Sequence, residues 1–337
     1  MVDAAALHRD ALVIDGLMFH GDGHSAGLRA AGVDAVNITV CGFEADFEAA
    51  CDGVADWLGA VAAPGSGWRL IETAADIDAA KSAGEVGLIM GWQNTRPIGD
   101  VLERLDLFHR LGLRVMQLTY NARNFLGDGC LEPDDGGLSA LGARAVARMN
   151  QLGIAIDLSH VGERTTLMAA EASAKPVLVT HANARALADW PRNKSDAVIR
   201  AVAAGGGLIG VSIYGPLLWD GDTSRPCGLG DLVRQAEYVA GIAGIGQLCF
   251  GTDLFAVADD EAYGAGLDMT AEFDNPAAEA YARAFDNTML GRYPADCRGL
   301  AALPALTRAF VDAGWAEADI RGLLGGNLRR VLGEIWG

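Results

Sequence analysis

Short runs of consecutive apolar residues recur along the chain, each followed by polar residues and then by a longer stretch rich in Ala and Leu. Uninterrupted apolar runs, in place of strict alternation, are typical of parallel strands that are buried on both faces. We therefore predict eight strands, at residues 12–14, 35–39, 86–90, 115–119, 154–157, 177–180, 208–212 and 248–251.

Helix candidates separate the predicted strands, most clearly at residues 101–111, 138–152, 164–174, 196–204 and 229–243. Strands that alternate with helices indicate βαβ units. Eight such units in 337 residues predict an α/β fold of the (β/α)8 TIM-barrel class. A doubly wound sheet is the alternative, but it would need a phosphate-binding glycine pattern that Asp15-Gly16-Leu17 does not provide. We expect one domain over residues 1–337, with a helical extension at about 263–337.

Composition narrows the expected partners. The formal net charge of −18 disfavours nucleic acid and anionic lipid, because like charges repel. No apolar run reaches the roughly 18 residues that a membrane span needs, and the first ten residues lack the pattern of a signal peptide. The six scattered cysteines form no CxxC pair, which indicates reduced thiols. We expect a cytoplasmic protein that binds a small molecule, with the oligomeric state left open, a homodimer included.

Polar residues at the strand ends indicate the chemistry, because barrel enzymes place their active sites at the carboxyl ends of the strands. His160 and His181 follow two successive predicted strands, and Asp253 follows the last one. Adjacent strand ends lie close together, so the two imidazoles can share one metal ion. Asp253 can then ligate the ion or accept a proton from a metal-activated water. A lone histidine after a strand is more often structural, but this combination favours a metal site.

Three further residues are candidates for contact with a substrate. Arg192 and Asn193 lie in the loop after the sixth predicted strand. A guanidinium group suits a carboxylate, although sequence spacing alone favours a solvated loop arginine. Tyr120 follows the fourth predicted strand and is either a core aromatic residue or a polar group over the site.

Several short segments together resemble the membrane (renal) dipeptidase family, peptidase family M19, from about Leu12 to the C-terminus. They are residues 112–121, 157–160, 180–183, 192–193, 251–253 and 325–327. The resemblance implies a (β/α)8 barrel that hydrolyses dipeptides with a binuclear zinc centre. It implies that His160 and His181 bind one zinc ion and that Asp253 is the acid/base group. It also implies that Arg192 and Asn193 hold the substrate, the arginine by its carboxylate.

The chain departs from the family pattern at the metal ligands. The family's first strand ends in Asp-Gly-His-x-Asp, whereas Leu17 and Phe19 occupy the positions of the two ligands here. The bridging glutamate falls at Gln93, and a histidine after the fourth strand falls at Tyr120. We therefore expect one divalent ion, zinc, bound by His160, His181 and Gln93 with an open position.

The missing ligands have one possible replacement in the chain. It consists of His20, Asp22 and His24, which lie beyond the family's ligand positions by about 10 Å of extended chain. This segment would have to fold back for its side chains to replace the missing ligands.

Three functions stay open. The first is hydrolysis of a dipeptide or a small dipeptide-like amide by a metallo-dipeptidase. The second is hydrolysis of another small amino-acid-derived substrate on the same scaffold, because a fold does not determine a reaction. The third is a catalytically inactive barrel that binds a ligand. A substrate panel separates the first two, and the metal content of the protein separates both from the third.

Overall fold

A computed structural model describes residues 2–257, 276–285 and 288–337 of the chain. Its strands pair in parallel in the order β10-β1-β2-β4-β5-β6-β7-β8-β9, and β3 adds to the side of β4. The strands are β1 Ile14–Gly21, β2 Ala35–Thr39, β3 Trp68–Leu70, β4 Val86–Trp92, β5 Leu113–Gln117, β6 Ala155–Asp157, β7 Leu178–Ala182, β8 Leu208–Val211, β9 Leu248–Phe250 and β10 Leu254–Ala256.

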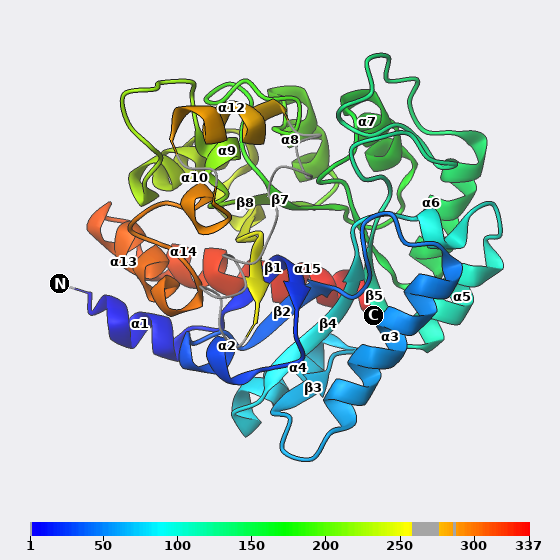
Figure 1. Cartoon of the computed structure of the whole chain (residues 1–337), viewed down its shortest axis with the longest axis horizontal. Helices are drawn as coiled ribbons and strands as arrows, with labels where there is room; N and C mark the ends of the chain where they lie inside the picture. Colours follow the sequence, from blue (N-terminus) through cyan, green and yellow to red (C-terminus); the bar gives the residue numbers. More distant parts are fainter. Residues whose placement is uncertain (1, 258–275, 286–287) are drawn as a thin grey trace.

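The sheet closes through the last strand segment (Figure 1). β9 pairs with β8, whereas β10 pairs with β1. Between them, the N–H of Gly251 donates to the carbonyl of Val211 at 3.2 Å, and the N–H of Asp253 donates to the carbonyl of Leu17 at 3.0 Å. Residues 248–256 therefore join both ends of the sheet, and the predicted TIM-barrel class is confirmed.

One layer of the barrel interior is formed by one buried side chain from each of the strands β1, β2 and β4 to β9. Its members are Ile14, Ala35, Ile89, Val115, Ala155, Leu178, Leu208 and Cys249. Helix α15 (Asn327–Trp336) packs against this layer with Leu328, Val331, Leu332 and Ile335. Their spacing of three or four residues places them on one face of a helix. Figure 1 shows α15 lying across the strands, so one end of the barrel is covered and the other is left for a site.

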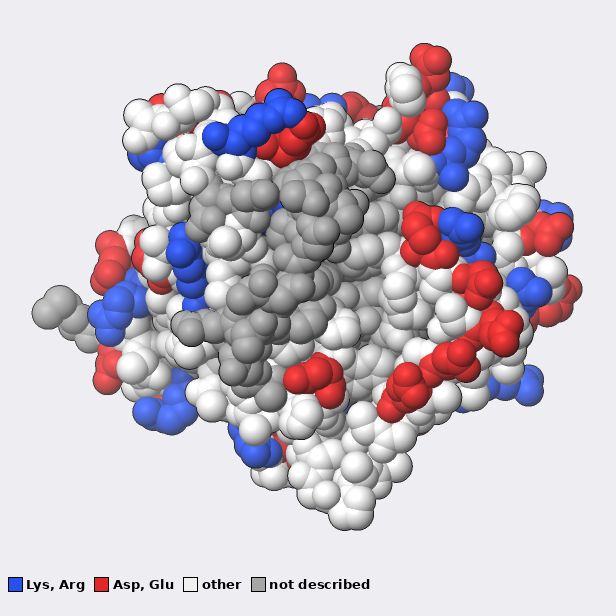
Figure 2. Space-filling view, in the orientation of Figure 1, with Lys and Arg blue, Asp and Glu red and all other residues white. Residues whose placement is uncertain are grey.

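Helices surround the ring, because each presents one apolar face to the strands. In α3, Ala50, Val54 and Trp57 are buried, whereas Glu48 and Asp52 are exposed. Figure 2 shows the resulting row of carboxylates over α3. The helices are α1 Ala4–Asp10, α2 Ala26–Ala30, α3 Phe47–Ala62, α4 Ala74–Ala83, α5 Glu103–Arg110, α6 Ala140–Leu152, α7 Glu163–Ala172, α8 Asp196–Ala204, α9 Gly215–Leu218, α10 Leu229–Ala243, α12 Pro276–Ala284, α13 Pro304–Asp312, α14 Glu317–Arg321 and α15.

The five predicted helices agree with the observed ones to within about two residues at each end. The prediction that the first strand covers residues 12–14 is wrong: β1 runs from Ile14 to Gly21, because Leu17 and Met18 continue its buried run. Strand β3 was not predicted. In the described part of the chain, no helix is both long and apolar enough to cross a bilayer.

The predicted C-terminal extension is described only in part. Residues 258–275 and 286–287 lie outside the described residues, and the helices α12 to α15 lie in the remainder of the predicted extension. The organisation as a single domain stays a prediction.

Candidate active site

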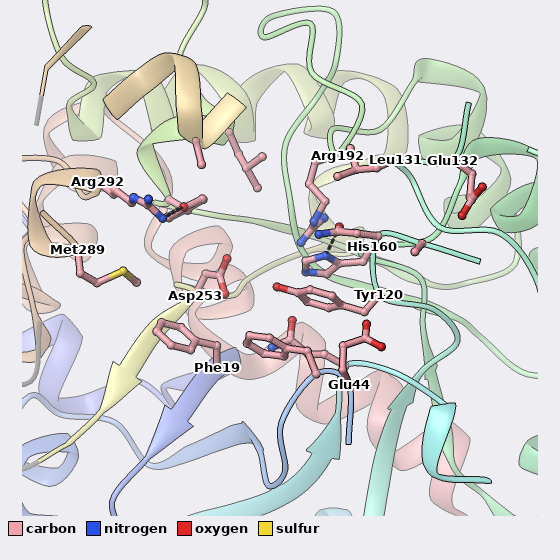
Figure 3. Close-up of a pocket in the computed structure, with 17 residues that line it drawn as sticks. Phe19, Glu44, Tyr120, Leu131, Glu132, His160, Arg192, Asp253, Met289 and Arg292 are labelled. Atoms are coloured by element: carbon pink, nitrogen blue, oxygen red, sulfur yellow. Dashed lines mark hydrogen bonds between the residues drawn. The ribbon is translucent and has the colours of Figure 1, made fainter. Parts of the chain in front are cut away.

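A pocket of about 480 Å³ opens at the carboxyl ends of the strands (Figure 3). Its size lies within the range of about 300–1,000 Å³ that is usual for small-molecule sites. Gln93, Tyr120, His160, Arg192 and Asp253, all candidates from the sequence, line it. Its other lining residues are Phe19, Phe43, Glu44, Asn121, Ala122, Leu131, Glu132, Tyr214, Leu217, Ala278, Met289 and Arg292.

The two histidines contact each other beside the pocket: His160 lines it, whereas His181 is fully buried and is not among its lining residues. His160 follows β6, and His181 lies in β7, the neighbouring strand. Their Nε2 atoms are 3.1 Å apart. Two imidazole nitrogens that share a tetrahedral zinc ion at about 2.0–2.1 Å each would lie about 3.3–3.4 Å apart. The spacing of the pair therefore fits a shared ion.

The outer ring nitrogens determine which tautomer each histidine adopts. Nδ1 of His160 lies 2.8 Å from the Asn121 Oδ1, which can only accept a hydrogen bond. Nδ1 of His181 lies 2.8 Å from the hydroxyl of Thr180, which donates its own proton to Asp157. Both Nδ1 atoms therefore carry the hydrogen, and the lone pairs of both Nε2 atoms face each other. That arrangement suits a proton or a metal ion between them.

Burial lowers the pKa of both histidines well below the ordinary value, and the nearby charge of Arg192 lowers both further. Lys194 acts in the same direction, and burial lowers its own pKa to about 7. A proton shared between the imidazoles is therefore disfavoured at neutral pH, whereas neutral imidazole is the form that binds a metal. The donor set fits a divalent ion better than it fits a proton.

The protein offers few further ligands for such an ion. Among the residues that the structure describes, no three His, Cys, Asp or Glu side chains are placed to hold a metal together. Gln93 lines the pocket, and its Nε2 donates to the hydroxyl of Thr39 at 2.9 Å. Its assignment as a third ligand stays a prediction.

The segment after β1 does not replace the missing ligands in the described structure. Asp22 and His24 form an exposed ion pair at 3.1 Å, and the N–H of Asp22 donates to the carbonyl of Ala256. His20 lies within β1 opposite Phe255. These residues therefore lie along the strand and at its end, and none of the three lines the pocket.

Asp253 lies in the gap between β9 and β10 and lines the pocket beside Phe19 (Figure 3). Its φ of 61° is left-handed, and Asn121 has a φ of 55°. In the described residues these are the non-glycine positions with positive φ, and both line the pocket. Such backbone strain is often found at functional sites. The hydroxyl of Tyr293 donates to the carbonyl of Asp253 and helps to hold it.

Tyr120 lies between two other rings. Its ring stacks on His160 at 4.2 Å between centroids and on Phe43 at 4.5 Å. Phe19 adjoins Phe43 at 6.4 Å, and all four rings line the pocket. One wall is therefore aromatic, and it includes Phe19, at the position of a missing metal ligand, and Tyr120, at the position of the family's histidine after the fourth strand.

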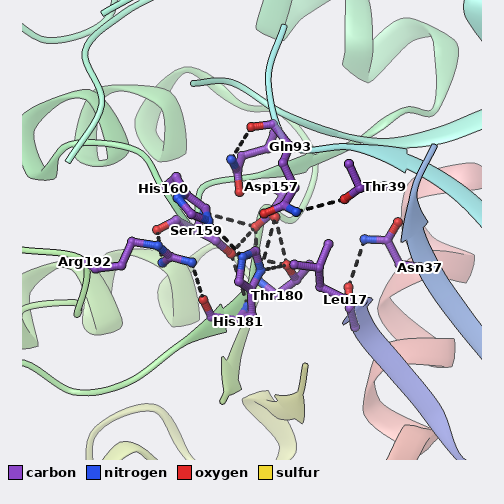
Figure 4. Close-up of polar contacts among 12 residues, drawn as sticks. Leu17, Asn37, Thr39, Gln93, Asp157, Ser159, His160, Thr180, His181 and Arg192 are labelled. Atoms are coloured by element: carbon purple, nitrogen blue, oxygen red, sulfur yellow. Dashed lines mark hydrogen bonds and ion pairs between the residues drawn. The ribbon is translucent and has the colours of Figure 1, made fainter. Parts of the chain in front are cut away.

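The loop after β7 contributes one pocket residue and one structural residue. Arg192 lines the pocket, but its guanidinium donates to the carbonyl oxygens of Ser159 and His181 at 2.5 and 2.9 Å (Figure 4). Asn193 is fully buried, and its side chain bonds to the backbone of Asn183, Ala188 and Leu217. Asn193 does not line the pocket, so the structure gives no support to its expected contact with a substrate.

Sequence reasoning missed several residues that shape the site. Asp15 and Asp157 are buried carboxylates that hold neighbouring strands, and Arg292 lines the pocket and donates to the hydroxyl of Tyr214. Asn121 could have been found, because it follows a strand end and its residue type tolerates positive φ. Arg292 lies far along the chain from every strand-end motif, and nothing near it in the sequence indicated a role.

Comparison with known proteins places the chain in a dipeptidase family. The model of the membrane dipeptidase family, peptidase family M19, matches residues 43–272. Dipeptidase aclJ of Aspergillus oryzae is 27% identical over 256 residues, which are 75% of this chain and 53% of the relative. An uncharacterised protein from the pqqA 5' region of Klebsiella pneumoniae is 26% identical over 80% of this chain and 89% of its own length. The chain thus spans about half the length of the fungal dipeptidase.

Solved structures agree with this result. An amidohydrolase from Pseudomonas aeruginosa is 30% identical, with a TM-score of 0.86 and full coverage of both chains. A metallo peptidase from Rhodobacter sphaeroides, liganded with a phosphinate mimic of the dipeptide L-Ala-D-Ala, is 21% identical. It covers 97% of this chain and 100% of its own with a TM-score of 0.79, and at that identity it shows a shared fold.

Proposed function

Because the chain belongs to the membrane dipeptidase family, peptidase family M19, we propose that it hydrolyses a dipeptide or a small dipeptide-like amide with one bound divalent ion, zinc. The fold and the family are those of metallo-dipeptidase-like hydrolases. The observation that carries the proposal is the distance of 3.1 Å between the Nε2 atoms of His160, which lines the pocket, and His181, which is buried next to it.

His160 and His181 would hold the ion, with Gln93 as a further, neutral ligand. When bound, the ion would polarise the scissile carbonyl and acidify water. The buried environment keeps both imidazoles neutral, since burial lowers their pKa values, so their lone pairs stay available. Thr180 and Asn121 hold the outer nitrogens and prevent the rings from turning.

Asp253 is the pocket carboxylate that we assign to proton transfer. It accepts a proton from water as the water oxygen bonds to the amide carbon, and returns that proton to the nitrogen as the C–N bond breaks. The backbone bonds to Leu17 and Tyr293 hold Asp253 in place during both transfers. Tyr120 lines the pocket as part of the aromatic wall, and we expect it to contact the substrate.

Arg192 is expected to attract the carboxylate of the substrate. Its guanidinium already donates to two carbonyl oxygens, so it acts chiefly through its charge at the pocket wall. Arg292 lines the pocket on the far side of Asp253 from Arg192 (Figure 3). The cytoplasmic location and a homodimeric state stay predictions.

The test is hydrolysis of a dipeptide panel in added zinc or manganese, together with elemental analysis. The wild type is expected to hold about one ion per chain and to release free amino acids. His160→Ala and His181→Ala should lose both properties. His24→Ala is the matched control, because that histidine is exposed and outside the pocket, and it should keep both. Full turnover by His160→Ala would overturn the proposal.

An inactive ligand-binding barrel is a second candidate, favoured by one observation. The described residues offer no third His, Cys, Asp or Glu ligand beside the histidine pair. A wild-type protein that cannot be loaded with zinc, yet binds a dipeptide in calorimetry, would support it. Turnover of a non-peptide amino-acid derivative, with no dipeptide cleaved, would instead indicate another hydrolase on the same scaffold.

A further inference from the structure

Two buried carboxylates at different places in the barrel share a set of three hydrogen bonds, and one of the two accepts a fourth. The first is Asp157, at the end of β6. Its Oδ1 accepts from the N–H of Ser159 at 3.1 Å, from the hydroxyl of Ser159 at 2.7 Å and from the N–H of Thr180 at 3.0 Å. Its Oδ2 accepts from the hydroxyl of Thr180 at 2.8 Å (Figure 4). Asp157 thus holds both polar donors of the residue that precedes His181.

The second is Asp15, in β1. Its Oδ1 accepts from the N–H of Leu17 at 3.0 Å and from the N–H of Thr252 at 3.0 Å. Its Oδ2 accepts from the hydroxyl of Thr252 at 2.6 Å. Asp15 therefore holds the residue that precedes Asp253, atom for atom as Asp157 holds the residue that precedes His181.

From this correspondence we infer that Asp157 and Asp15 are positioning residues. Asp157 orients His181 to bind the ion, and Asp15 orients Asp253 for proton transfer. The inference rests on the proposed function, because it takes His181 as a ligand and Asp253 as the proton-transfer group. Neither aspartate lines the pocket, so each acts through its threonine.

The chemistry of the contacts requires a carboxylate at both positions. Every hydrogen-bond partner of the two aspartates donates, and an ionised carboxylate accepts at both oxygens, whereas an amide accepts at one. Because burial raises the pKa of Asp15 to about 7, Asp15 accepts at both oxygens above that pH. Asp15 and Asp157 are at most 1% exposed. Burying a carboxylate is costly unless it is fully hydrogen-bonded, so the three bonds to Asp15 and the four to Asp157 offset much of that cost.

Each threonine connects its aspartate to the functional side chain that follows it in the sequence. The hydroxyl of Thr180 passes the constraint directly to Nδ1 of His181, at 2.8 Å. Thr252 passes it through the backbone, because Asp253 follows it in a left-handed conformation and donates its N–H to Leu17. Functional groups that are misplaced by about 1 Å lose much of their activity, so both constraints matter for function.

The test replaces each threonine by valine, which has a similar shape and removes only the hydroxyl. Thr180→Val is expected to weaken zinc binding by about 10–100-fold in a chelator competition titration. Thr252→Val should change zinc affinity by less than about twofold, yet lower kcat in saturating zinc by about 10-fold or more with KM little changed. Thr180→Ser and Thr252→Ser, which keep the hydroxyl, should restore most of each loss.

A matched control separates positioning from stability. Thr307 is also buried, and its hydroxyl lies 2.7 Å from Nδ1 of His8, far from the pocket in the contact between α1 and α13. Thr307→Val removes the same kind of bond, so it should lower stability as the other two variants do and leave zinc affinity and kcat as in the wild type.

The inference is overturned if Thr180→Val and Thr252→Val change zinc affinity equally, or if neither differs from Thr307→Val. A wild type that cleaves no dipeptide would contradict the proposed function without touching the zinc titration, which still decides the role of Asp157. The role of Asp15 is then decided by a crystal structure of Thr252→Val, in which an Asp253 side chain that keeps its place overturns it.

Discussion

Arg192 bonds to the backbone of His181: the Nη2 of Arg192 donates to the carbonyl oxygen of His181 at 2.9 Å. Its other terminal nitrogen donates to the carbonyl of Ser159, the residue before His160. One guanidinium therefore ties together the backbones that carry both histidines. A planar fork can make two such bonds at fixed geometry, which a lysine ammonium cannot.

Arg192→Lys should therefore destabilise the protein although the charge is kept. We expect the free energy of unfolding to fall by about 2–4 kcal/mol, because two buried carbonyls lose a charged donor. Denaturant unfolding measures this. Arg200→Lys is the control, since Arg200 is exposed and paired only with Asp196, and it should cost less than about 0.5 kcal/mol. Equal effects of the two substitutions would contradict the assignment.

The aromatic wall should select substrates by their side chains. Phe19, Phe43 and Tyr120 present their rings to the pocket, so a large apolar side chain can pack there. Phe19→Ala should lower kcat/KM for dipeptides with Phe or Leu by about 10-fold or more, and for glycine dipeptides by much less. Phe125→Ala, which removes a ring that is 61% exposed, should leave this preference as in the wild type. A uniform loss across all dipeptides would argue against the wall as a side-chain site.

Stability should depend on pH through Asp15. Burial raises its pKa to about 7, and the hydrogen bonds from Thr252 and Leu17 only partly oppose the rise. Between pH of about 4 and 7 the folded protein keeps a proton that the unfolded chain has released, so the free energy of unfolding falls as pH rises. This contribution amounts to about 4 kcal/mol over the whole interval.

Asp15→Asn removes that titration. Denaturant unfolding at several pH values should give a curve that falls less steeply between pH of about 4 and 7 than the wild-type curve. Parallel curves for the two proteins would show that Asp15 ionises in the folded state as it does in the unfolded chain.

Gly251 should tolerate no side chain. A Cβ atom at this position would lie 2.3 Å from the carbonyl oxygen of Thr180 and 3.1 Å from the Cβ of His181. Gly251→Ala should therefore cost about 3 kcal/mol or prevent folding. Gly241→Ala, in α10 with open space around it, should be neutral or stabilising by up to about 1 kcal/mol. Thermal unfolding compares the two, and a stable Gly251→Ala protein would refute the close approach.

The strand ends show which features of the site could be predicted from local sequence patterns. Buried apolar runs and the helices between them predicted the barrel, and barrel topology then placed the ends of β6 and β7 side by side. The pairing of His160 and His181 follows from that topology, and the structure brings them to 3.1 Å. The end of the first strand was predicted too early, because Asp and Gly are residue types that often end a strand. In the structure, β1 continues through Asp15 and Gly16.

Local sequence patterns did not predict the direction in which each side chain points at the strand ends. Asn193 lies next to Arg192 in the sequence, yet its amide serves the backbone of its own loop while Arg192 lines the pocket. Asp253 reaches the pocket but does not join the histidines in a three-ligand metal group in the described structure. Each outcome depends on which partners the fold brings to that side chain.

The sequence alone determined the class of fold, the end of the barrel that carries the chemistry, and the two imidazoles that meet there. These follow from hydrophobic runs of a few residues and from the rule that successive parallel strands are neighbours, so local information suffices. Only the tertiary structure decided which carboxylates hold the site, because Asp15 and Thr252 are 237 residues apart in the chain. Contacts at such separations are made only when the ring of strands closes, and no local pattern records them.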